Sequence, residues 1–167
     1  MLSSYLACIS ITEKAQPNCR VGILMKVIEV IYARGHANVQ STHKTTFQIT
    51  REPFLSKRGD CVIAVGATKG AIDLSSKFKE TARHEKAQIT VTIEVDNVKE
   101  VVKAQGTKRL TFTHPNDLIA RKSSYVCDRT LAVRADKAAC DLSRKLVEKL
   151  QNPEQRVKVT LIAENAT

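Results

Sequence analysis

The stretch IAVGATKGAIDLSSKF at residues 63–78 recurs as LAVRADKAACDLSRKL at residues 131–146. At this shift of 68 residues, nine of the sixteen aligned positions are identical. The same shift, without a gap, also aligns the apolar positions of residues 89–97 with those of residues 157–165. A match of this length indicates a repeated unit of strand, helix and strand. We therefore predict that the chain is internally duplicated.

The repeat divides the chain into two units, at about residues 21–97 and 98–167. Units of this size are marginally stable alone, so we predict that they form a single domain over residues 21–167. Residues 1–20 have no counterpart in the second half, and we interpret them as an N-terminal extension. Their apolar run has no Lys or Arg before it and is too short for a signal peptide or a membrane span. We predict a cytoplasmic protein with no membrane partner.

Hydrophobic periodicity predicts the order β-β-β-α-β in each unit. In the first unit, we expect strands at residues 21–32, 45–50, 61–67 and 89–95. In the second unit, we expect strands at residues 98–104, 109–113 and 157–163. The strand at residues 21–32 carries apolar side chains on both faces, which predicts that both faces are covered. Residues 89–95 alternate between apolar and polar side chains, which predicts one face in solvent.

Each unit also contains one predicted helix. Apolar residues recur at helical spacing in both copies, at Ala71, Leu74, Phe78 and Ala82 and again at Ala139, Leu142, Leu146 and Leu150. Thr68 and Asp136 lie at matching N-cap positions, where a side-chain oxygen can accept a hydrogen bond from the first turn. We predict an α+β, β-rich fold with pseudo-twofold symmetry, in which a curved, mostly antiparallel sheet is covered by two equivalent helices.

The composition is typical of a soluble globular protein, with 43% apolar and 26% charged residues. The net charge is +10, from 27 basic and 17 acidic residues. Residues 21–93 contribute +5 (11 minus 6) and residues 94–167 contribute +4 (14 minus 10), so the excess belongs to the folded surface. A positive surface favours polyanions as partners.

Five cysteines are scattered along the chain, at Cys8, Cys19, Cys61, Cys127 and Cys140. None of them forms a C-x-x-C pair, which argues against a zinc knuckle or a thioredoxin-type motif. We expect most of them to be small buried apolar residues.

Several separate motifs, taken in order, carry a family resemblance. They are Arg34-Gly35-His36, residues 43–50 (HKTTFQIT), Gly59-Asp60-Cys61, residues 113–117 (THPND), Arg121-Lys122-Ser123, Arg129-Thr130-Leu131 and residues 135–139 (ADKAA). From about Val21 to its end, the chain resembles the archaeal family catalogued as domain of unknown function 371. The resemblance implies a β-rich fold, and it brings no established activity, cofactor or residue role.

Lys69 and Lys137 occupy matching positions at the predicted helix starts. One interpretation is a pair of anion sites, each made of a helix N-terminus and a lysine. The other, which we favour, is that each lysine begins a Lys-Asp-Lys row on a solvated helix face, because an Asp and a Lys follow at i+4 and i+8.

Two segments differ between the copies and are therefore better candidates for a functional site. Residues 34–44 carry Arg34, His36, His43 and Lys44, and residues 113–124 carry His114, Asp117, Arg121 and Lys122. Loops held by a rigid scaffold are where sites usually lie. Under twofold symmetry, we expect Lys57-Arg58 to correspond to Arg121-Lys122 and to form a shared basic groove with Arg129. The alternative is ordinary solvated loop charge.

A metal site would require His36, His43 and His114 to converge with Asp60 or Cys61. No pair has a metal-site spacing such as H-x-x-x-H, so we predict no metal and no cofactor. Cys61 or Ser123 could act as a nucleophile, but G-x-S-x-G is absent, and we favour a buried, inert Cys61. The chain also lacks a P-loop and a G-x-G-x-x-G motif.

Our first functional hypothesis is a non-enzymatic domain that binds RNA or DNA through the basic loops at residues 34–44, Lys57-Arg58, Arg121-Lys122 and Arg129. Aromatic residues are scarce, so such binding would depend on charge and shape. A second hypothesis is an enzyme or sensor for a small anionic ligand, with phosphorylated compounds among the candidates, at the histidine-bearing loops. A third is a scaffold that binds another protein. No catalytic motif decides whether the protein is an enzyme.

Overall fold

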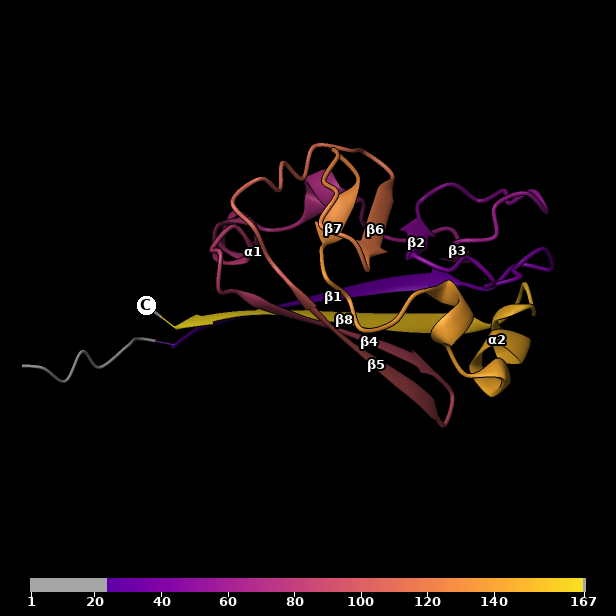
Figure 1. Ribbon diagram of the computed structural model, residues 1–167. Helices are drawn as coiled ribbons and strands as arrows, with labels where there is room; N and C mark the ends of the chain where they lie inside the picture. The colour runs from indigo at the N-terminus through magenta and orange to yellow at the C-terminus, as the bar shows by residue number, and fades with distance from the viewer. Residues whose placement is uncertain (1–23, 167) are drawn as a thin grey trace, which may run out of the picture.

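The fold is α+β and consists mainly of two four-stranded sheets. A computed structural model describes residues 24–166, and the predicted extension at residues 1–20 lies outside this range. The larger sheet is antiparallel, with the order β1 (Leu24–Arg34), β8 (Arg156–Ala166), β4 (Gln88–Val95) and β5 (Val98–Gln105). The smaller sheet has the order β3 (Val62–Ala64), β2 (Thr46–Thr50), β6 (Asp117–Arg121) and β7 (Thr130–Ala132). The smaller sheet lies over one face of the larger one (Figure 1).

The strand-rich, mostly antiparallel character is confirmed, but the strands form two sheets instead of one. In the smaller sheet the central pair β2 and β6 is antiparallel, and each outer strand is parallel to its neighbour. Isolated bridges between Arg34 and Val65, and between Gln105 and Val133, join the two sheets. The order β-β-β-α-β occurs in each half of the chain, with a short 3-10 turn before each α-helix.

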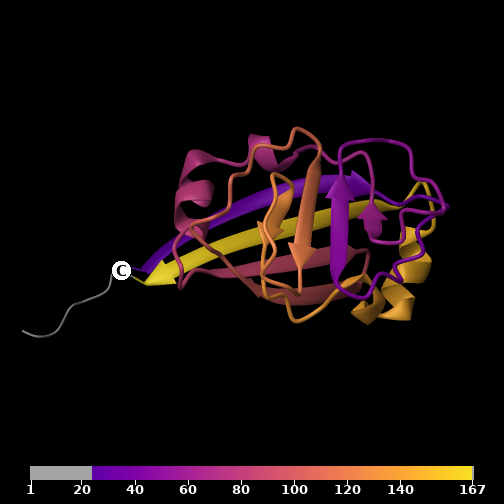
Figure 2. The same cartoon turned by 45° about the horizontal axis from the view of Figure 1, so that its top comes forward.

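Each helical segment begins with a 3-10 turn, η2 (Ala71–Asp73) or η3 (Ala139–Asp141), and continues as α1 (Ser76–Ala82) or α2 (Arg144–Leu150). The α-helices start after Ser75 and Ser143. Each serine hydroxyl accepts a hydrogen bond from the backbone N–H of the residue three positions later, Phe78 or Leu146. α1 and α2 lie at opposite ends of the larger sheet (Figures 1 and 2).

The predicted N-caps at Thr68 and Asp136 were therefore wrong. The Thr68 hydroxyl accepts a hydrogen bond from the backbone N–H of Tyr32 (3.1 Å), and the Asp136 carboxylate accepts one from Lys103 N–H (3.0 Å). Each side chain thus accepts from a backbone N–H on an edge strand of the larger sheet, β1 or β5. Edge N–H groups need partners as much as helix ends do.

The core lies between the two sheets and the helices. Ile89, Val91 and Ile93 of β4 are fully buried, whereas the intervening side chains face outward, as the alternation predicted. The two apolar stripes are buried as well, although each spans a 3-10 turn and an α-helix. Phe78 of α1 meets Phe112 edge to face, with 6.3 Å between ring centroids.

The predicted strand at residues 109–113 was wrong, because this segment is irregular and the strand is β6. Leu110 and Phe112 alternate because both side chains are anchored in the core, 2% and 1% exposed. Phe112 has a positive φ of 51°, which no extended strand allows. The predicted strand at residues 61–67 is also shorter, since β3 covers three residues.

Matching contacts connect the halves. The N–H of Ile72 in η2 donates to the carbonyl of His114, and the N–H of Cys140 in η3 donates to the carbonyl of His43. The N–O distance is 3.0 Å in both. Each 3-10 turn thus holds a histidine-bearing loop that comes from the other half of the chain.

Candidate functional site

The three histidines of the predicted site hold the backbone of their own loops. His43 Nδ1 accepts hydrogen bonds from the N–H groups of Thr45 (3.2 Å) and Thr46 (3.1 Å). His114 Nδ1 accepts from the N–H groups of Asn116 (3.2 Å) and Asp117 (2.9 Å).

His36 repeats this pattern, because its Nδ1 accepts from Asn38 N–H over 3.0 Å. This geometry places the ring hydrogen on Nε2 and gives each ring a turn-forming role. Within residues 24–166, no three His, Cys, Asp or Glu side chains form a metal-binding group, so these histidines complete no metal-ligand set with Asp60 or Cys61 there.

Asp117 is the centre of a compact polar cluster at the start of β6. Its carboxylate is 9% exposed and accepts a hydrogen bond from the Thr50 hydroxyl (2.7 Å). Arg129 Nε and His114 Nδ1 lie 3.5 and 3.8 Å from its second oxygen. The structure therefore brings three predicted site residues together. Thr50 and Arg129 satisfy the Asp117 carboxylate, whereas His114 Nδ1 lies near it as an acceptor for the loop N–H groups.

Arg121, at the end of β6, also makes internal contacts. Its guanidinium donates to the Thr130 hydroxyl (3.1 Å) and to Cys127 Sγ (3.1 Å), and it lies over the Tyr125 ring, 5.0 Å from the centroid. Partial burial opposes ionisation of Cys127, but hydrogen bonds from Arg129 N–H, Thr130 and Arg121 outweigh it and lower the pKa of this thiol.

The other described cysteines differ from Cys127. Burial, and then the nearby Asp60 carboxylate, raise the pKa of the Cys61 thiol. Cys140 is exposed. The expectation of mostly buried cysteines was wrong for the three that the structure describes, because each adjoins a polar loop; Cys8 and Cys19 lie outside the described residues.

Lys69 and Lys137 form neither anion sites nor solvated helical rows. Lys69 Nζ donates to the carboxylate of Glu29 on β1 at a distance of 2.5 Å, and Lys137 Nζ lies 3.2 Å from the carboxylate of Glu100 on β5. Burial opposes ionisation of Glu29, but hydrogen bonds from Lys69 and from Ser75 N–H outweigh it and lower the pKa of its carboxyl. Both interpretations were wrong, because the lysines precede the helices and connect them to the larger sheet.

Lys122 is held in a short ion pair with Asp141 of η3, at 2.6 Å. The hydrogen bond between them raises the pKa of Lys122 and lowers that of Asp141. In the first half, Arg51 makes the matching contact with Asp73 of η2. Arg51, and not Lys57-Arg58, therefore corresponds to Lys122, because the β2 to β3 loop is longer than the sequence comparison suggested.

Three of the remaining cations of the predicted groove are exposed, and Arg34 is half-buried. Lys44, Lys57 and Arg58 have no ion pair with any residue in the range 24–166. Arg34 ends β1, and its guanidinium lies 3.5 Å from the carbonyl of Pro53.

A second set of cations lies on the outer face of the larger sheet, the face turned away from the smaller sheet. Every second residue of each strand points to this face, as the alternating burial shows. The cations of this outer face are Lys26, Arg34, Lys99, Lys103, Arg156 and Lys158. Its carboxylates are Glu94 and Glu164, so the face carries an excess of four positive charges (6 minus 2).

The middle of the outer face is apolar or carries hydroxyl groups. The β-branched side chains that pair across its four strands are Ile28, Val30, Thr90, Thr92, Val101, Thr160 and Ile162. Ile28 is 56% exposed, and Tyr32 at one end of the same strand is 50% exposed. The prediction that the first strand is covered on both faces was wrong, because its second apolar face is this open one.

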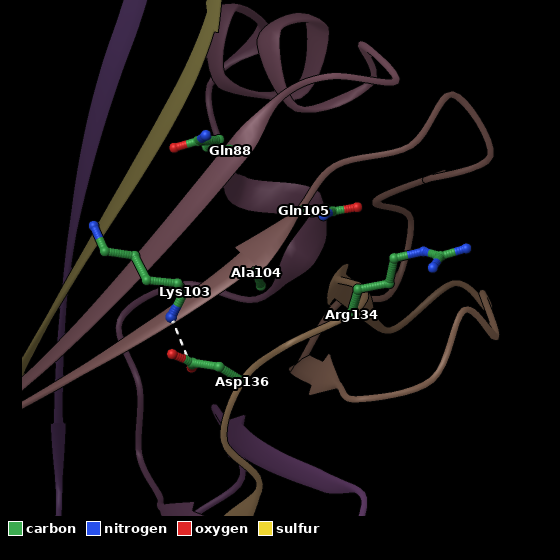
Figure 3. A pocket seen from close by; sticks show the side chains of 6 residues that line it. All are labelled: Gln88, Lys103, Ala104, Gln105, Arg134 and Asp136. Carbon is green, nitrogen blue, oxygen red and sulfur yellow. Dashed lines mark hydrogen bonds between the residues drawn. The ribbon is translucent and has the colours of Figure 1, made fainter.

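Three pockets border the outer face, and two of them lie at opposite corners of the sheet. One, of about 440 Å³, is lined by Gln88, Lys103, Ala104, Gln105, Arg134 and Asp136 (Figure 3). The other, of about 270 Å³, includes Tyr32, Arg34, Gly66 and Arg156. The first lies beside the C-terminal end of β5 and the second beside the C-terminal end of β1.

Comparison with known proteins identifies a relationship. Residues 31–164 match the family model described as Domain of unknown function (DUF371). The chain belongs to this family. A DUF371 relative, an uncharacterized protein of Methanocaldococcus jannaschii, is 43% identical over 128 residues, which cover 77% of this chain and 94% of the relative. The function of the DUF371 family is unknown. Neither helix described in this DUF371 chain has the length and apolarity needed to cross a membrane.

Of the outer-face cations of this DUF371 protein, only Arg34 was among the predicted site residues, because the prediction was confined to the segments that differ between the copies. A signal was nevertheless present in the first strand. Residues 24–34 (LMKVIEVIYAR) are apolar on both faces although the strand is at a sheet edge. An edge strand of that kind indicates an exposed apolar patch with a function.

Proposed function

We propose that this protein binds nucleic acid through the outer face of its larger sheet. The observation that carries the proposal is the excess of four positive charges on an open face whose centre is apolar. Lys and Arg side chains around such a face can neutralise phosphates, which supplies most of the affinity for nucleic acid.

Charge complementarity favours a polyanion over a second copy of this chain. Two copies joined by this face would bring eight excess positive charges together (4 plus 4), and like charges oppose each other across an interface. The whole chain carries +10, so a long-range field attracts the same class of partner.

The apolar centre of the face supports contact with more than phosphates. Tyr32 is half exposed and can stack with one base. Ile28 and its β-branched neighbours offer apolar contact to bases and sugars. With one aromatic side chain on the face, affinity depends chiefly on charge and shape.

The histidine-bearing loops favour a structural role over a small-ligand site. Each described Nδ1 atom of His36, His43 and His114 is occupied by backbone N–H groups. Asp117, Arg121 and Arg129 are likewise engaged with internal partners. Lys44 stays available for a secondary phosphate contact.

We further infer that the two halves arose by duplication and are related by a pseudo-twofold axis. Matched contacts support this: Glu29 with Lys69 and Glu100 with Lys137, or Arg51 with Asp73 and Lys122 with Asp141. We also propose a cytoplasmic location, in which nucleic acid is accessible.

The test is fluorescence anisotropy of labelled RNA and DNA across a salt series, with the Lys99→Ala/Lys158→Ala double variant. Loss of two phosphate contacts is expected to reduce the salt slope by about 1.4 and to weaken binding about 25-fold at 0.1 M salt, from about 0.7 in the slope per contact. The matched control is Lys57→Ala/Arg58→Ala, which removes the same charge from an exposed loop.

Two results would contradict the proposal. The first is absence of binding by the unmodified protein at low salt. The second is equal weakening by the face variant and the loop control, which would show a response to net charge alone.

A further inference from the structure

We infer that the nucleic acid bound by this protein is single-stranded and that one of its nucleotides occupies the corner pocket beside β5. Lys103 and Arg134 contact the phosphates on either side of that nucleotide, and the amides of Gln88 and Gln105 contact the nucleotide itself. This inference rests on the proposed function and adds the partner's form, a subsite and a path.

Arg134 has a backbone conformation that suits glycine. Its φ is 51°, in the left-handed region that costs a side-chain-bearing residue energy. Gly66, with φ 60°, occupies the corresponding place in the first half, and both residues donate a backbone hydrogen bond to a loop carbonyl. A strained position that keeps a large cationic side chain points to a role for that side chain.

The Arg134 guanidinium is available for a ligand. The residue is exposed, and its side chain makes no hydrogen bond or ion pair with residues 24–166. In Figure 3 it extends beside Gln105, whereas Lys103 extends on the other side of β5. Lys103 Nζ donates to the Thr90 hydroxyl on the outer face (3.2 Å), so the two cations lie on opposite sides of β5, where they can contact two successive phosphates.

The glutamines add hydrogen-bonding capacity. Gln88 of β4 and Gln105 of β5 are directly paired across the strands, and both are exposed. Neither side-chain amide has a hydrogen-bond partner in the described part of the chain. Each amide offers a donor and an acceptor, so the pair can recognise base edges and sugar hydroxyls. The volume of about 440 Å³ suits one small ligand unit.

The acidic group in the pocket is already engaged. The Asp136 carboxylate accepts the backbone N–H of Lys103 over 3.0 Å, and Asp136 N–H donates to the Lys103 carbonyl over 2.9 Å. This pair of bonds fixes the Lys103 backbone against the Arg134 loop. A neighbouring pocket of about 150 Å³ shares Arg134 and adds Lys108 and Arg109, so the basic surface continues around the sheet edge.

The path of the strand follows from the positions of the two corners. Arg34 and Arg156 pair at one end of the sheet, and Lys103 lies level with Ile28 on the opposite edge strand. That is six residues along the strands and three strand spacings across, or about 24 Å on the diagonal at ~3.3 Å per residue and ~4.8 Å per strand. The distance fits an extended strand of about four nucleotides or more.

A single strand fits this path better than a duplex. The apolar centre and the glutamine amides require exposed bases, which an unpaired strand offers. A duplex directs its bases inward and is read by elements that enter a groove. Within residues 24–166, the outer face presents strands of the sheet, and no described helix lies between the corners.

The decisive variant is Arg134→Gly, measured with a labelled single strand. It removes one phosphate contact, so binding is expected to weaken about fivefold at 0.1 M salt and the salt slope to fall by about 0.7. Its unfolding temperature is expected to stay within about 2 °C, because relief of the left-handed conformation offsets the greater freedom of glycine. Arg134→Lys should retain the slope.

Two further measurements use the unmodified chain. Across strands of about two to twelve nucleotides, affinity is expected to rise steeply until the strand spans both corners, and then to level off. A duplex of equal phosphate number is expected to bind more weakly. Duplex binding that equals or exceeds single-strand binding would overturn the inference, as would an unchanged affinity of Arg134→Gly.

The failures are distinguishable. If the unmodified protein binds neither RNA nor DNA, the proposed function fails and the inference fails with it. If Lys99→Ala/Lys158→Ala weakens binding and Arg134→Gly does not, the outer face stands and only the pocket is rejected.

Discussion

The Glu29 carboxylate on β1 accepts a hydrogen bond of 2.7 Å from the backbone N–H of Ser75, the N-cap of α1. The same carboxylate receives Lys69 Nζ, and it is 6% exposed. One buried acid therefore fixes the start of a helix and the loop before it to an edge strand. Within residues 24–166, this carboxylate is the acceptor for both donors.

Replacing this acid should destabilise the fold. We expect Glu29→Ala to reduce the free energy of unfolding by about 2 kcal/mol, because the backbone N–H of Ser75 and the partly exposed Lys69 ammonium are left without this acceptor. The measurement is urea unfolding followed by circular dichroism. Glu164→Ala, which breaks the exposed Lys26–Glu164 pair, serves as the control and should cost less than about 0.5 kcal/mol.

The same group should make stability depend on acid pH. The pKa of Glu29 is lowered in the folded protein, so the unfolded chain binds its proton first as the pH falls. Its contribution is then complete above the unfolded value of about 4.3 and is lost as the pH drops through the lower folded value. Unfolding curves of the native chain and of Glu29→Gln should converge between pH 7 and pH 3. A constant difference would contradict this assignment.

Gly106 should tolerate no side chain. A Cβ atom there would lie 1.9 Å from the carbonyl oxygen of Ala82, at the end of α1. We expect Gly106→Ala to cost more than about 3 kcal/mol, because backbone has to move. Gly66→Ala is the comparison: its Cβ would meet the flexible Arg34 side chain at 3.2 Å, and its φ of 60° should cost about 1 kcal/mol. Thermal unfolding measures both.

Cys127 should react with iodoacetamide faster than Cys61. The pKa of Cys127 is lowered and that of Cys61 is raised, and the thiolate is the reactive form. At neutral pH we expect at least a roughly tenfold difference in rate, measured by mass spectrometry of peptides. Arg121→Ala should slow Cys127, because the guanidinium donates to its sulfur. Equal rates in the two proteins would show that Arg121 does not activate this thiol.

His114→Ala should lower stability by about 1–2 kcal/mol without weakening nucleic-acid binding. The variant leaves the N–H groups of Asn116 and Asp117 without their acceptor. His114→Asn should recover part of the loss, because an Asn side chain can accept from the following backbone. Failure of Asn to rescue would indicate that the ring has a different role.

The sequence repeat predicted the helical segments and the pairs of strands around them, because these features are local. The helix starts were misplaced, since Thr68 and Asp136 satisfy Tyr32 and Lys103, each more than 30 residues away. These two acceptors could be matched to their donors only if the positions of the edge strands β1 and β5 were already known. Local sequence favoured a cap equally well.

β6 was missed for a related reason. Its residues DLIAR are all buried except the last, so they lack the alternation by which a half-exposed strand is recognised. Leu110 and Phe112 do alternate, but both anchor an irregular segment in the core. Both faces of β6 are covered by parts of the chain distant in sequence, so the order of apolar and polar residues within β6 does not reveal the strand.

The candidate site was predicted in part. The charge excess pointed to a polyanion, but the sequence could not show which cations are neutralised by partners distant in the chain. Lys122 and Lys137 are paired with Asp141 and Glu100. Lys99 and Lys158 were not among the predicted site residues. Both pair with Glu94 across neighbouring strands, and they therefore lie on the same outer face.

The pairing of Leu24 with Ala166 brings the two ends of the described chain together in the β1–β8 ribbon (Figure 1). A short linker in place of residues 1–23 could therefore join them, and the turn between β4 and β5 could be opened to create new ends. The permuted chain would begin with the second half and end with the first, in the same order of elements. The same fold could therefore be formed by a chain that begins at β1 or by one that begins at β5, with either half first.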